Sequence, residues 1–186
     1  MARYELVKGL PVMTMAEGKQ VGKIDDLIVD PERKAVSWLR LHSGGMGMLG
    51  AARLWVPAEA VHGVGEHAVT INAEADARSA GDAPEAFALG KAKRGIIGSK
   101  VMTENGQRLG EVRDYEFDPY TFALTSLSIP PAGNVPGDIL TIAGENVLTI
   151  GEDVIVVATT GEMQSAAGTA DTVNQPIASA ETVVTL

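Results

Sequence analysis

The chain has 186 residues, of which 45% are hydrophobic and only 4% aromatic, and its formal net charge is −9. That charge opposes sequence-independent binding to nucleic acid, which depends on Lys and Arg contacts to phosphates. The lack of cysteine excludes disulfides, thiolate metal sites and a cysteine nucleophile, and because no long apolar run is present we expect a cytoplasmic protein without a membrane span or secretion signal.

The same stretch of sequence occurs twice. Gly18–Asp30 is repeated as Gly106–Asp118, a shift of 88 residues, and a proline follows each copy. A repeat this long predicts duplicated domains, because solenoids use shorter units in at least three copies. Domains of about 70 residues bury a modest fraction of their surface, so we expect the two copies to pack on one another.

Each copy begins with a short strand followed by a long, irregular one. Residues 1–8 are interpreted as a polar lead-in and 10–15 as the first strand. In the second strand, 21–29, the apolar spacing slips by one position, and the second copy slips at the same place. This slip is typical of a β-bulge, which lets a short sheet bend into a small closed or nearly closed barrel. Gly22 and Gly110 are predicted to lie at a bend or a close strand approach.

An Asp-Pro turn and a third strand follow in both copies. Asp30-Pro31 and Asp118-Pro119 have the chemistry of a type I turn, in which Asp bonds forward and Pro presets φ. The third strands are predicted at 36–42 and 124–129. Alternation along these strands predicts four core residues: Leu39, Leu41, Leu127 and Ile129.

The opposite face of the third strand and the loop after it differ between the copies. Trp38 falls on this face, and its counterpart Ser126 predicts either exposure or an interface with the sister domain. The glycine-rich loop at 42–53 contrasts with a proline-rich loop at 130–138. Adaptable apolar side chains on such a loop suit a contact surface, although the loop could instead fold back on either domain. The predicted partner-binding residues are Trp38, Met46, Met48 and Leu49.

An alanine- and charge-rich segment connects the two copies. Asp82 is interpreted as a helix N-cap, Glu85 as its capping-box partner and Gly90 as the stop of a short helix. Phe87 and Leu89 are predicted to dock this helix between the two domains.

A longer pattern surrounds the repeated stretch. It reads Gly-x-x-Val/Leu-Gly-x-Ile/Val-x-Asp-x-x-Val/Phe-Asp-Pro, then a strand, a loop, a Val-Pro-Ala-Glu-Ala-Val segment at 56–61 and Val-Gly-Glu before the last strand. This pattern resembles the PRC-barrel family, which includes the cytoplasmic part of the photosynthetic reaction-centre H subunit and the C-terminal domain of a ribosome-maturation factor. The resemblance implies a small β-barrel used for protein–protein contact, without a shared catalytic centre. In the second copy Ile142-Ala143-Gly144 replaces Val56-Pro57-Ala58, which implies that this copy kept its core and lost a binding surface.

The expected fold is therefore all-β, with two tandem PRC-like β-barrels related by internal duplication. We place the first barrel at 5–73, a linker with a short helix at 74–94 and the second barrel at 95–160. The remaining residues, 161–186, have few apolar anchors and are predicted to form a mobile tail.

Several polar residues are candidates for catalytic or metal-binding groups. Carboxylates at matching places in the two copies (Asp26 with Asp114, Asp30 with Asp118) could hold a hard cation, but their positions beside a bulge and a turn favour backbone hydrogen bonding. The three histidines have no counterparts and are interpreted as exposed: His42, His62 and His67. Because nucleophile-elbow, phosphate-loop and EF-hand patterns are also missing, we predict no catalytic residue, metal site or cofactor.

Three functions remain open from the sequence. The first is a non-enzymatic scaffold that binds an unidentified protein partner, or itself, through the methionine-rich loop and the Trp38 region. The second is a ribosome- or RNA-associated assembly factor, although nucleic acid is disfavoured by the acidity and the few clustered basic residues are interpreted as a solvated face: Lys91, Lys93, Arg94 and Lys100. The third is a stress- or membrane-complex-associated adaptor.

Overall fold

The structure is a computed structural model that describes most of the chain. The described residues are 1–42, 53–91, 95–131 and 139–159. The predicted tail and the three predicted loop residues, Met46, Met48 and Leu49, lie outside them. No helix in these ranges is long and apolar enough to cross a bilayer.

The first repeat folds as one six-stranded sheet with the order β5-β4-β3-β2-β7-β6. All neighbours are antiparallel except β2 and β7. A single-turn helix, η1 (Ala58–Ala60), separates β5 from β6, and another, η2 (Glu74–Asp76), follows β7. The strands are β2 (Pro11–Thr14), β3 (Gln20–Asp30), β4 (Ala35–His42), β5 (Arg53–Pro57), β6 (Val61–Val64) and β7 (Val69–Ile71).

The second repeat follows the same succession, except that two short strands, β9 and β10, stand in place of the long β3, and its strands are split between two four-stranded sheets. The orders are β13-β14-β8-β9 and β1-β10-β11-β12, where β1 (Ala2–Arg3) comes from the N-terminus. This confirms the predicted β-rich duplication, although within the described residues no strand pairing closes a full barrel. The elements are β8 (Lys100–Thr103), β9 (Arg108–Glu111), β10 (Asp114–Phe117), β11 (Leu124–Ile129), β12 (Leu140–Ala143), η3 (Gly144–Asn146), β13 (Val147–Ile150) and β14 (Val154–Val157).

The predicted bulges and close approaches are present. The pairing of β3 with β4 changes register between Ile24 and Asp26, and the second repeat leaves its ladder between β9 and β10 at the equivalent place. A Cβ on Gly22 would lie 2.9 Å from the carbonyl oxygen of His42, and Gly110 has a φ of 144°. Both glycines therefore occupy backbone positions that a larger residue would strain.

One hydrophobic core serves both repeats. The four predicted core residues of β4 and β11 are confirmed, because all are almost fully buried. They belong to a single cluster with apolar residues from both repeats and from the N-terminal segment. Burial of one continuous core is what small domains need, because each alone would bury too little surface.

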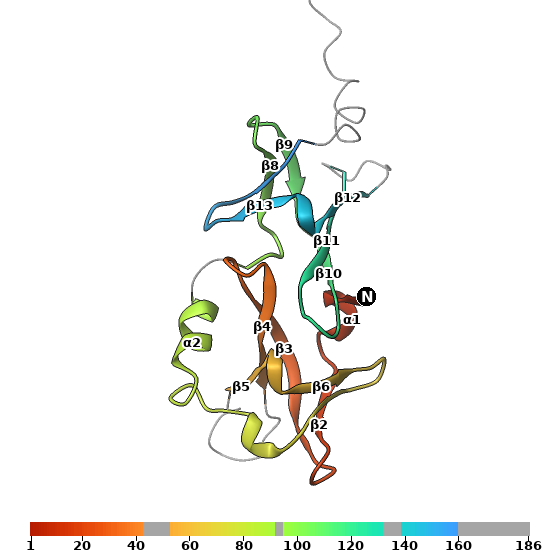
Figure 1. The fold of residues 1–186 in the computed structure, drawn as a ribbon, viewed down its shortest axis with the longest axis vertical. Coiled ribbons are helices and arrows are strands. Elements are labelled where there is room, and N and C mark those ends of the chain that lie inside the picture. The colour runs from red at the N-terminus through yellow and green to blue at the C-terminus, as the bar shows by residue number, and fades with distance from the viewer. Residues whose placement is uncertain (43–52, 92–94, 132–138, 160–186) are drawn as a thin grey trace, which may run out of the picture.

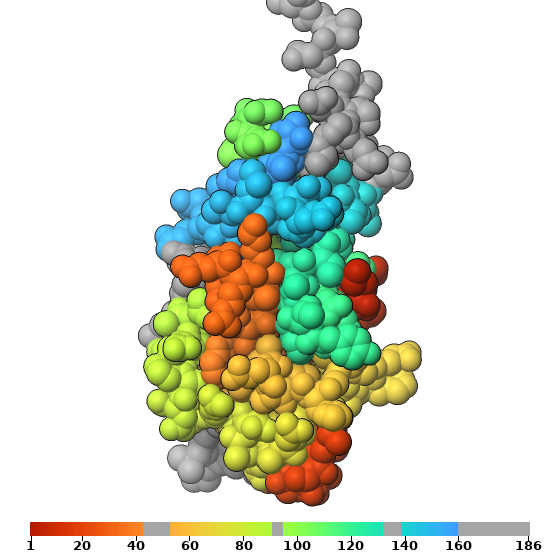
Figure 2. Space-filling model, in the orientation of Figure 1, coloured from red at the N-terminus to blue at the C-terminus, as the bar shows by residue number. Residues whose placement is uncertain are grey.

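The two repeats meet through equivalent turns, 34–36 and 122–124, which are 88 residues apart. Ala35 and Ala123 form an antiparallel bridge at the centre. The flanking hydrogen bonds are reciprocal and each is 2.9 Å long: Val36 N–H donates to the Phe122 carbonyl, and Leu124 N–H donates to the Lys34 carbonyl. The junction is thus an internal counterpart of a two-fold dimer interface, in which the same patch is used on both sides. In Figure 2 the orange strands of the first repeat and the teal β10–β11 pair lie side by side.

The N-terminal residues, interpreted above as a polar lead-in, pack on the second repeat. β1 pairs with β10, and the short helix α1 (Tyr4–Val7) follows beside it (Figure 1). Tyr4 and Val7 are buried. The lead-in interpretation is wrong because these two apolar residues, three positions apart, lie on one face of the helix and complete the common core.

The linker helix, α2 (Pro84–Lys91), differs from the prediction at both ends. It begins at a proline, which suits the first turn because its missing N–H has no partner to lose there. The residue directly before the helix is Ala83, so the predicted N-cap is one position too early, and the Asp82 carboxylate accepts a hydrogen bond from Ser79 Oγ at 2.6 Å. Gly90 lies inside the helix and not at its stop, and a Cβ there would come within 2.7 Å of the Trp55 ring. Gly90 therefore permits a close approach of helix to sheet.

The helix packs on the first repeat through small residues, and its Glu85 also lines a space shared with Tyr120 of the second repeat. Ala83 and Ala86 are buried against Ile28 and Trp55. Leu89 packs partly on the same cluster, whereas Phe87 is 40% exposed. The prediction that Phe87 docks the helix between the repeats is wrong, because alanines bring the helix axis closer to the sheet than an aromatic ring would.

Candidate functional site

A groove of about 470 Å³ lies where the two repeats meet. The first repeat contributes the outer face of β4 and the single-turn helix η1. The second repeat contributes the turn at 120–122. The groove combines aromatic and aliphatic side chains with three charged ones, and we call it the junction groove: Arg33, Val36, Trp38, Pro57, Glu59, Val61, Glu85, Tyr120 and Phe122 are among its lining residues.

Trp38 is placed on the outer face of β4, as predicted. Its side chain is half-buried and packs beside the cluster that holds the linker helix. The Arg78 guanidinium lies 5.8 Å from the centre of its ring, a cation–π contact. Trp38 therefore keeps a partly exposed ring in a fixed orientation.

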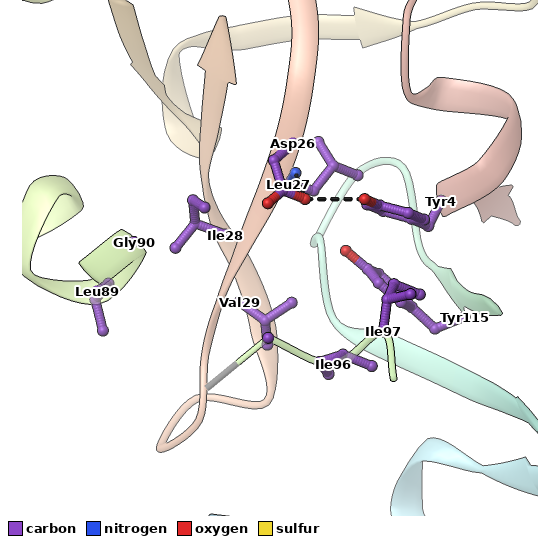
Figure 3. Close-up of a pocket in the computed structure, with 11 residues that line it drawn as sticks. Tyr4, Asp26, Leu27, Ile28, Val29, Leu89, Gly90, Ile96, Ile97 and Tyr115 are labelled. Atoms are coloured by element: carbon purple, nitrogen blue, oxygen red, sulfur yellow. Dashed lines mark hydrogen bonds between the residues drawn. The ribbon is translucent and has the colours of Figure 1, made fainter. Parts of the chain in front are cut away.

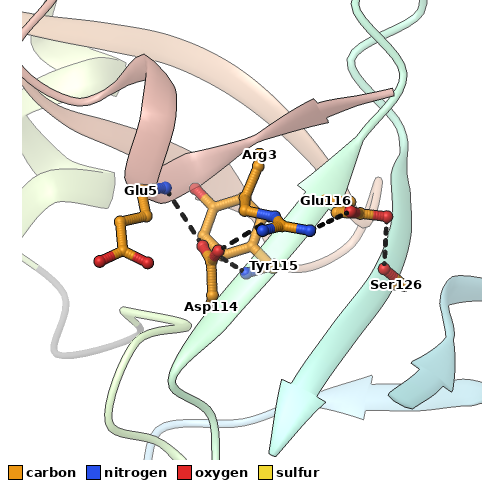
Figure 4. Close-up of polar contacts among 6 residues, drawn as sticks. All are labelled: Arg3, Glu5, Asp114, Tyr115, Glu116 and Ser126. Carbon is orange, nitrogen blue, oxygen red and sulfur yellow. Dashed lines mark hydrogen bonds and ion pairs between the residues drawn. The ribbon is translucent and has the colours of Figure 1, made fainter. Parts of the chain in front are cut away.

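The counterpart of Trp38 behaves differently. Ser126 is buried, and its hydroxyl donates a hydrogen bond of 3.1 Å to Glu116 (Figure 4). Of the two alternatives predicted for this face, exposure or an interface, exposure does not hold at Ser126. Arg3, on the neighbouring strand β1, lies 3.3 Å from Glu116 and 3.6 Å from Asp114 of β10.

Tyr120 is the groove residue that the sequence prediction missed. Its side chain is 90% exposed, which is unusual for an aromatic residue in a well-formed turn. The backbone below it is fixed by Asp118, whose Oδ1 accepts hydrogen bonds from the N–H groups of Tyr120 at 2.9 Å and Thr121 at 2.7 Å. The sequence feature that could have identified Tyr120 is an aromatic residue directly after the second Asp-Pro pair, where the first copy has Glu32.

The predicted role of the Asp-Pro pairs is confirmed by these bonds. Asp30 Oδ1 likewise accepts from the N–H of Glu32 at 2.9 Å. In the second repeat the N–H groups of Thr121 and Tyr120, together with the Thr121 hydroxyl, hold the pKa of the Asp118 carboxyl below its usual value. The charged carboxylate is the better acceptor, so the turn is most stable when Asp118 is ionised.

The two equivalent turns at the junction carry different side chains at their positive-φ position, and these side chains point to different places. Lys34 and Phe122 are equivalent, and both have positive φ, 50° and 60°. Phe122 turns inward and stacks on Phe117 with ring centres 5.7 Å apart. Lys34 cannot bury its charge in that way, and its ammonium instead donates to the Val147 carbonyl at 2.5 Å. Val147 is the equivalent of Val61, and Val61 lines the junction groove. The Lys34 side chain therefore bridges the place on the second repeat that corresponds to this part of the groove.

Of the predicted partner-binding residues, Trp38 is the one that the structure describes. Trp38 pairs with Pro57 at the groove end of β4 and β5. The loop that carries Met46, Met48 and Leu49 connects the other ends of these strands, at His42 and Arg53. Trp38 lines the junction groove, and the three loop residues lie outside the described chain.

The bulge carboxylates hold the backbone, as the backbone hydrogen-bonding interpretation predicts. Asp26 Oδ1 accepts from the Leu27 N–H at 3.0 Å, and Asp114 Oδ1 from the Tyr115 N–H at 2.9 Å. Arg40 also binds Asp26, at 3.1 Å. All three histidines are exposed, as predicted: His42, His62 and His67. Within the described ranges no three Asp, Glu or His side chains gather as they would around a metal ion.

Comparison with known proteins gives one family. The family model of the PRC-barrel domain matches the chain twice, at residues 1–78 and 92–164. A search of the curated proteins found no match.

Proposed function

The chain belongs to the PRC-barrel domain family and carries its domain twice, and from this we propose that it is a non-enzymatic interaction module that binds a protein partner in the junction groove. One observation carries the proposal. Trp38 from the first repeat and Tyr120 from the second line the same groove, so the duplication creates a surface that neither repeat has alone.

The groove has the composition of an interface centre. Trp and Tyr are enriched at binding hot spots because they bring large, rigid, amphipathic surfaces at low entropic cost. Tyr120 is almost fully exposed in the free protein, and burial of its ring by a partner would contribute about 1.5–3 kcal/mol. The Asp118 turn already holds its backbone, so little is lost in ordering it on binding.

The charges in the groove suit a partner with mixed polarity. Arg33, Glu59 and Glu85 line it together with the aromatic rings. Arg33 Nε lies 3.6 Å from Asp30 Oδ2, an ion pair, and the Arg33 side chain is still 77% exposed. These groups favour correct orientation of a protein segment more than they add affinity.

The test compares groove variants of the full-length protein. Trp38→Ser copies the second repeat, Tyr120→Ser removes the exposed ring, and Leu148→Ser is the matched control because Leu148 is an exposed apolar residue (44%) outside the groove. Quantitative affinity purification from the source cells would identify partners, and light scattering after size-exclusion chromatography would report self-association. We expect a partner, or a second copy of the chain, to be retained by wild type and Leu148→Ser and lost with either groove variant.

Identical partners and identical mass for all four proteins would overturn the groove as the binding surface. Retention of ribosomal particles that falls steeply with added salt would favour the RNA-associated alternative, since phosphate contacts are strongly salt-dependent.

A further inference from the structure

The outer edge of β5, in the first repeat, is covered by the chain that follows β7. Trp55 and Arg78 form an antiparallel bridge there. The Trp55 N–H donates to the Arg78 carbonyl and the Arg78 N–H donates to the Trp55 carbonyl, each at 2.8 Å. The first repeat thus satisfies backbone groups of this edge strand with a segment of its own sequence.

The equivalent edge of the second repeat belongs to β12, and it has no such cover among the described residues. Beyond the two unlike loops the copies are related by a shift of 86 residues, so Thr141 corresponds to Trp55 (141 − 55 = 86) and Val157 to Ile71 (157 − 71 = 86). β12 is the last strand of its sheet, and Thr141 is exposed. The same place in the fold is therefore covered in one repeat and open in the described part of the other.

The backbone polar groups of Thr141 point away from β11. Thr141 faces Ser128 in the pairing of β12 with β11. The Ser128 carbonyl accepts the Arg113 N–H at 2.9 Å on the opposite side of β11. Because the N–H and C=O groups of one residue in an antiparallel ladder point to the same side, Ser128 and Thr141 form a pair without mutual hydrogen bonds. The Thr141 N–H and C=O are therefore directed outward, as those of Trp55 are.

The other sheet edges in the described ranges have protective features that β12 lacks. The ladders of β6 and β13 are each interrupted by a register shift, at 61–63 and 147–149. β9 carries Arg108 and Glu111, and β1 is 2 residues long. Bulges, charges and short length keep foreign strands from an edge. β12 instead pairs without a register shift, contains only uncharged residues and follows Ile139, which is 62% exposed.

The opposite edge of the same sheet is covered by a segment from a terminus of the chain. There β1 pairs with β10. The helix after β1 is held by Tyr4, whose ring stacks on Tyr115 with centres 5.0 Å apart and whose hydroxyl donates to Asp26 at 3.0 Å (Figure 3). The N-terminal segment therefore completes one side of this sheet and is anchored across the junction.

The sequence that corresponds to the covering segment of the first repeat follows Thr159 and lies outside the described chain. The shift of 86 places 162–166 opposite 76–80. The two segments read Glu-Met-Gln-Ser-Ala and Asp-Ala-Arg-Ser-Ala, so an acidic first residue and a final Ser-Ala recur. The two matches to the family model end at residues 78 and 164, which are again 86 apart (164 − 78 = 86). The second copy thus carries the sequence of the segment that covers the edge in the first copy.

We propose that residues 162–166 bind the outer edge of β12, with the backbone of Gln164 paired to that of Thr141. Gln164 follows β14 at the same interval at which Arg78 follows β7, so the segment has the length that the first repeat uses. The pairing is made by backbone groups and does not need the Arg78 side chain, which contacts the Trp38 ring. The counterparts of both residues have changed together, to Gln164 and Ser126.

Amide hydrogen exchange in the ¹⁵N-labelled full chain tests this pairing at Thr141. Wild type is compared with Gln164→Pro, which removes the N–H that would donate to the Thr141 carbonyl, and with Gln175→Pro, the same change outside the segment. We expect the Thr141 amide to exchange slowly in wild type and Gln175→Pro, and roughly tenfold faster in Gln164→Pro. The Ile142 amide faces Leu127 on β11, so it should be unaffected and reports that the sheet stays folded.

A mixture of ¹⁵N-labelled and unlabelled wild-type chains shows which molecule supplies the segment. Isotope-filtered NOE spectra separate contacts within one chain from contacts between chains, and we expect an NOE between the Thr141 and Gln164 amides of the same chain. An NOE from Thr141 to another chain would assign the edge to a second copy, and fast exchange of Thr141 in wild type would leave the edge open. Either result, or slow exchange that Gln164→Pro does not change, would overturn the proposal.

Discussion

Trp38 in the first repeat and Ser126 in the second occupy equivalent places, yet Trp38 lines an open groove while Ser126 is buried beside Glu116. Below them, Leu39 and Leu127 are equivalent and both almost fully buried. The contrast shows that the duplicated chain keeps its inward-facing residues alike and varies the outward-facing ones. An internal two-fold arrangement thus supplies the scaffold, and the departures from symmetry supply the distinctive surface.

The departures trace to a few side chains. Phe122 folds into its own core, whereas the equivalent Lys34 reaches across to the Val147 carbonyl. The single-turn helices differ in the same region, since a Cβ on Gly144 would collide with the Leu124 carbonyl, while the first repeat accommodates Ala58 at the equivalent position. Each difference is a single residue, so each can be tested by exchange.

The largest effect is expected where the N-terminal helix joins the two repeats. Tyr4→Ala would remove the stack on Tyr115 and the bond to Asp26, and we expect a loss of about 3–5 kcal/mol in the free energy of unfolding. Urea denaturation measures it. Leu6→Ala, on the same helix but 68% exposed, should change stability by less than about 0.5 kcal/mol. Similar small losses for both variants would mean that the helix does not hold the repeats together.

A smaller effect is expected at the single-turn helices. Gly144→Ala should destabilise by about 1–3 kcal/mol, because the added methyl group meets the Leu124 backbone. Ala58→Gly should cost about 0.5–1 kcal/mol through the greater backbone freedom of glycine. Thermal unfolding of both variants measures the difference, and equal costs would contradict the idea that the second repeat is packed more tightly here.

The bridge from Lys34 should contribute less again. Lys34→Met keeps the length of the side chain and removes the bond to the Val147 carbonyl, so we expect a loss of about 1 kcal/mol. Lys100→Met, at an exposed strand position, is the control. If the two substitutions had the same effect in urea denaturation, Lys34 would not distinguish the two sides of the junction.

The stability of the Asp118 turn should depend on pH, which gives a further test of how the turn of the second repeat is held. NMR titration should give Asp118 a pKa below its usual value, and Thr121→Ala should move that pKa upward because one of its hydrogen bonds is lost. Since the folded-state pKa is the lower one, the contribution of Asp118 to stability is present above the unfolded pKa of about 3.9 and is lost as the pH falls through the folded pKa. An unchanged pKa in Thr121→Ala would show that the hydroxyl contributes nothing.

Local patterns predicted the repeated unit well. Leu39 and Leu41 alternate along one strand and Leu127 and Ile129 along its counterpart, and each Asp-Pro pair carries its turn chemistry in the adjacent residues. The bulge was also predictable, since a slip in apolar spacing needs no knowledge of the rest of the chain. The family resemblance rests on these same local features.

Long-range contacts were not predictable in the same way. Nothing near Tyr4 indicates that it stacks on Tyr115, because the pairing depends on how the two repeats face each other. The junction groove was not predicted for the same reason. Trp38 could be identified from its own strand, but it shares a groove with Tyr120 only because the two turns form a bridge at Ala35 and Ala123. Contacts between equivalent turns leave no periodic trace in the sequence.

The two repeats form one body through a shared core and reciprocal turns, and residues of the chain itself can report on whether they unfold together. Both of its tryptophans, Trp38 and Trp55, lie in the first repeat, while the Leu127 amide reports on the second. Urea unfolding followed by tryptophan fluorescence and by the NMR signal of that amide should give one midpoint for both probes. Two separate midpoints, with one repeat unfolding while the other stays folded, would contradict the claim.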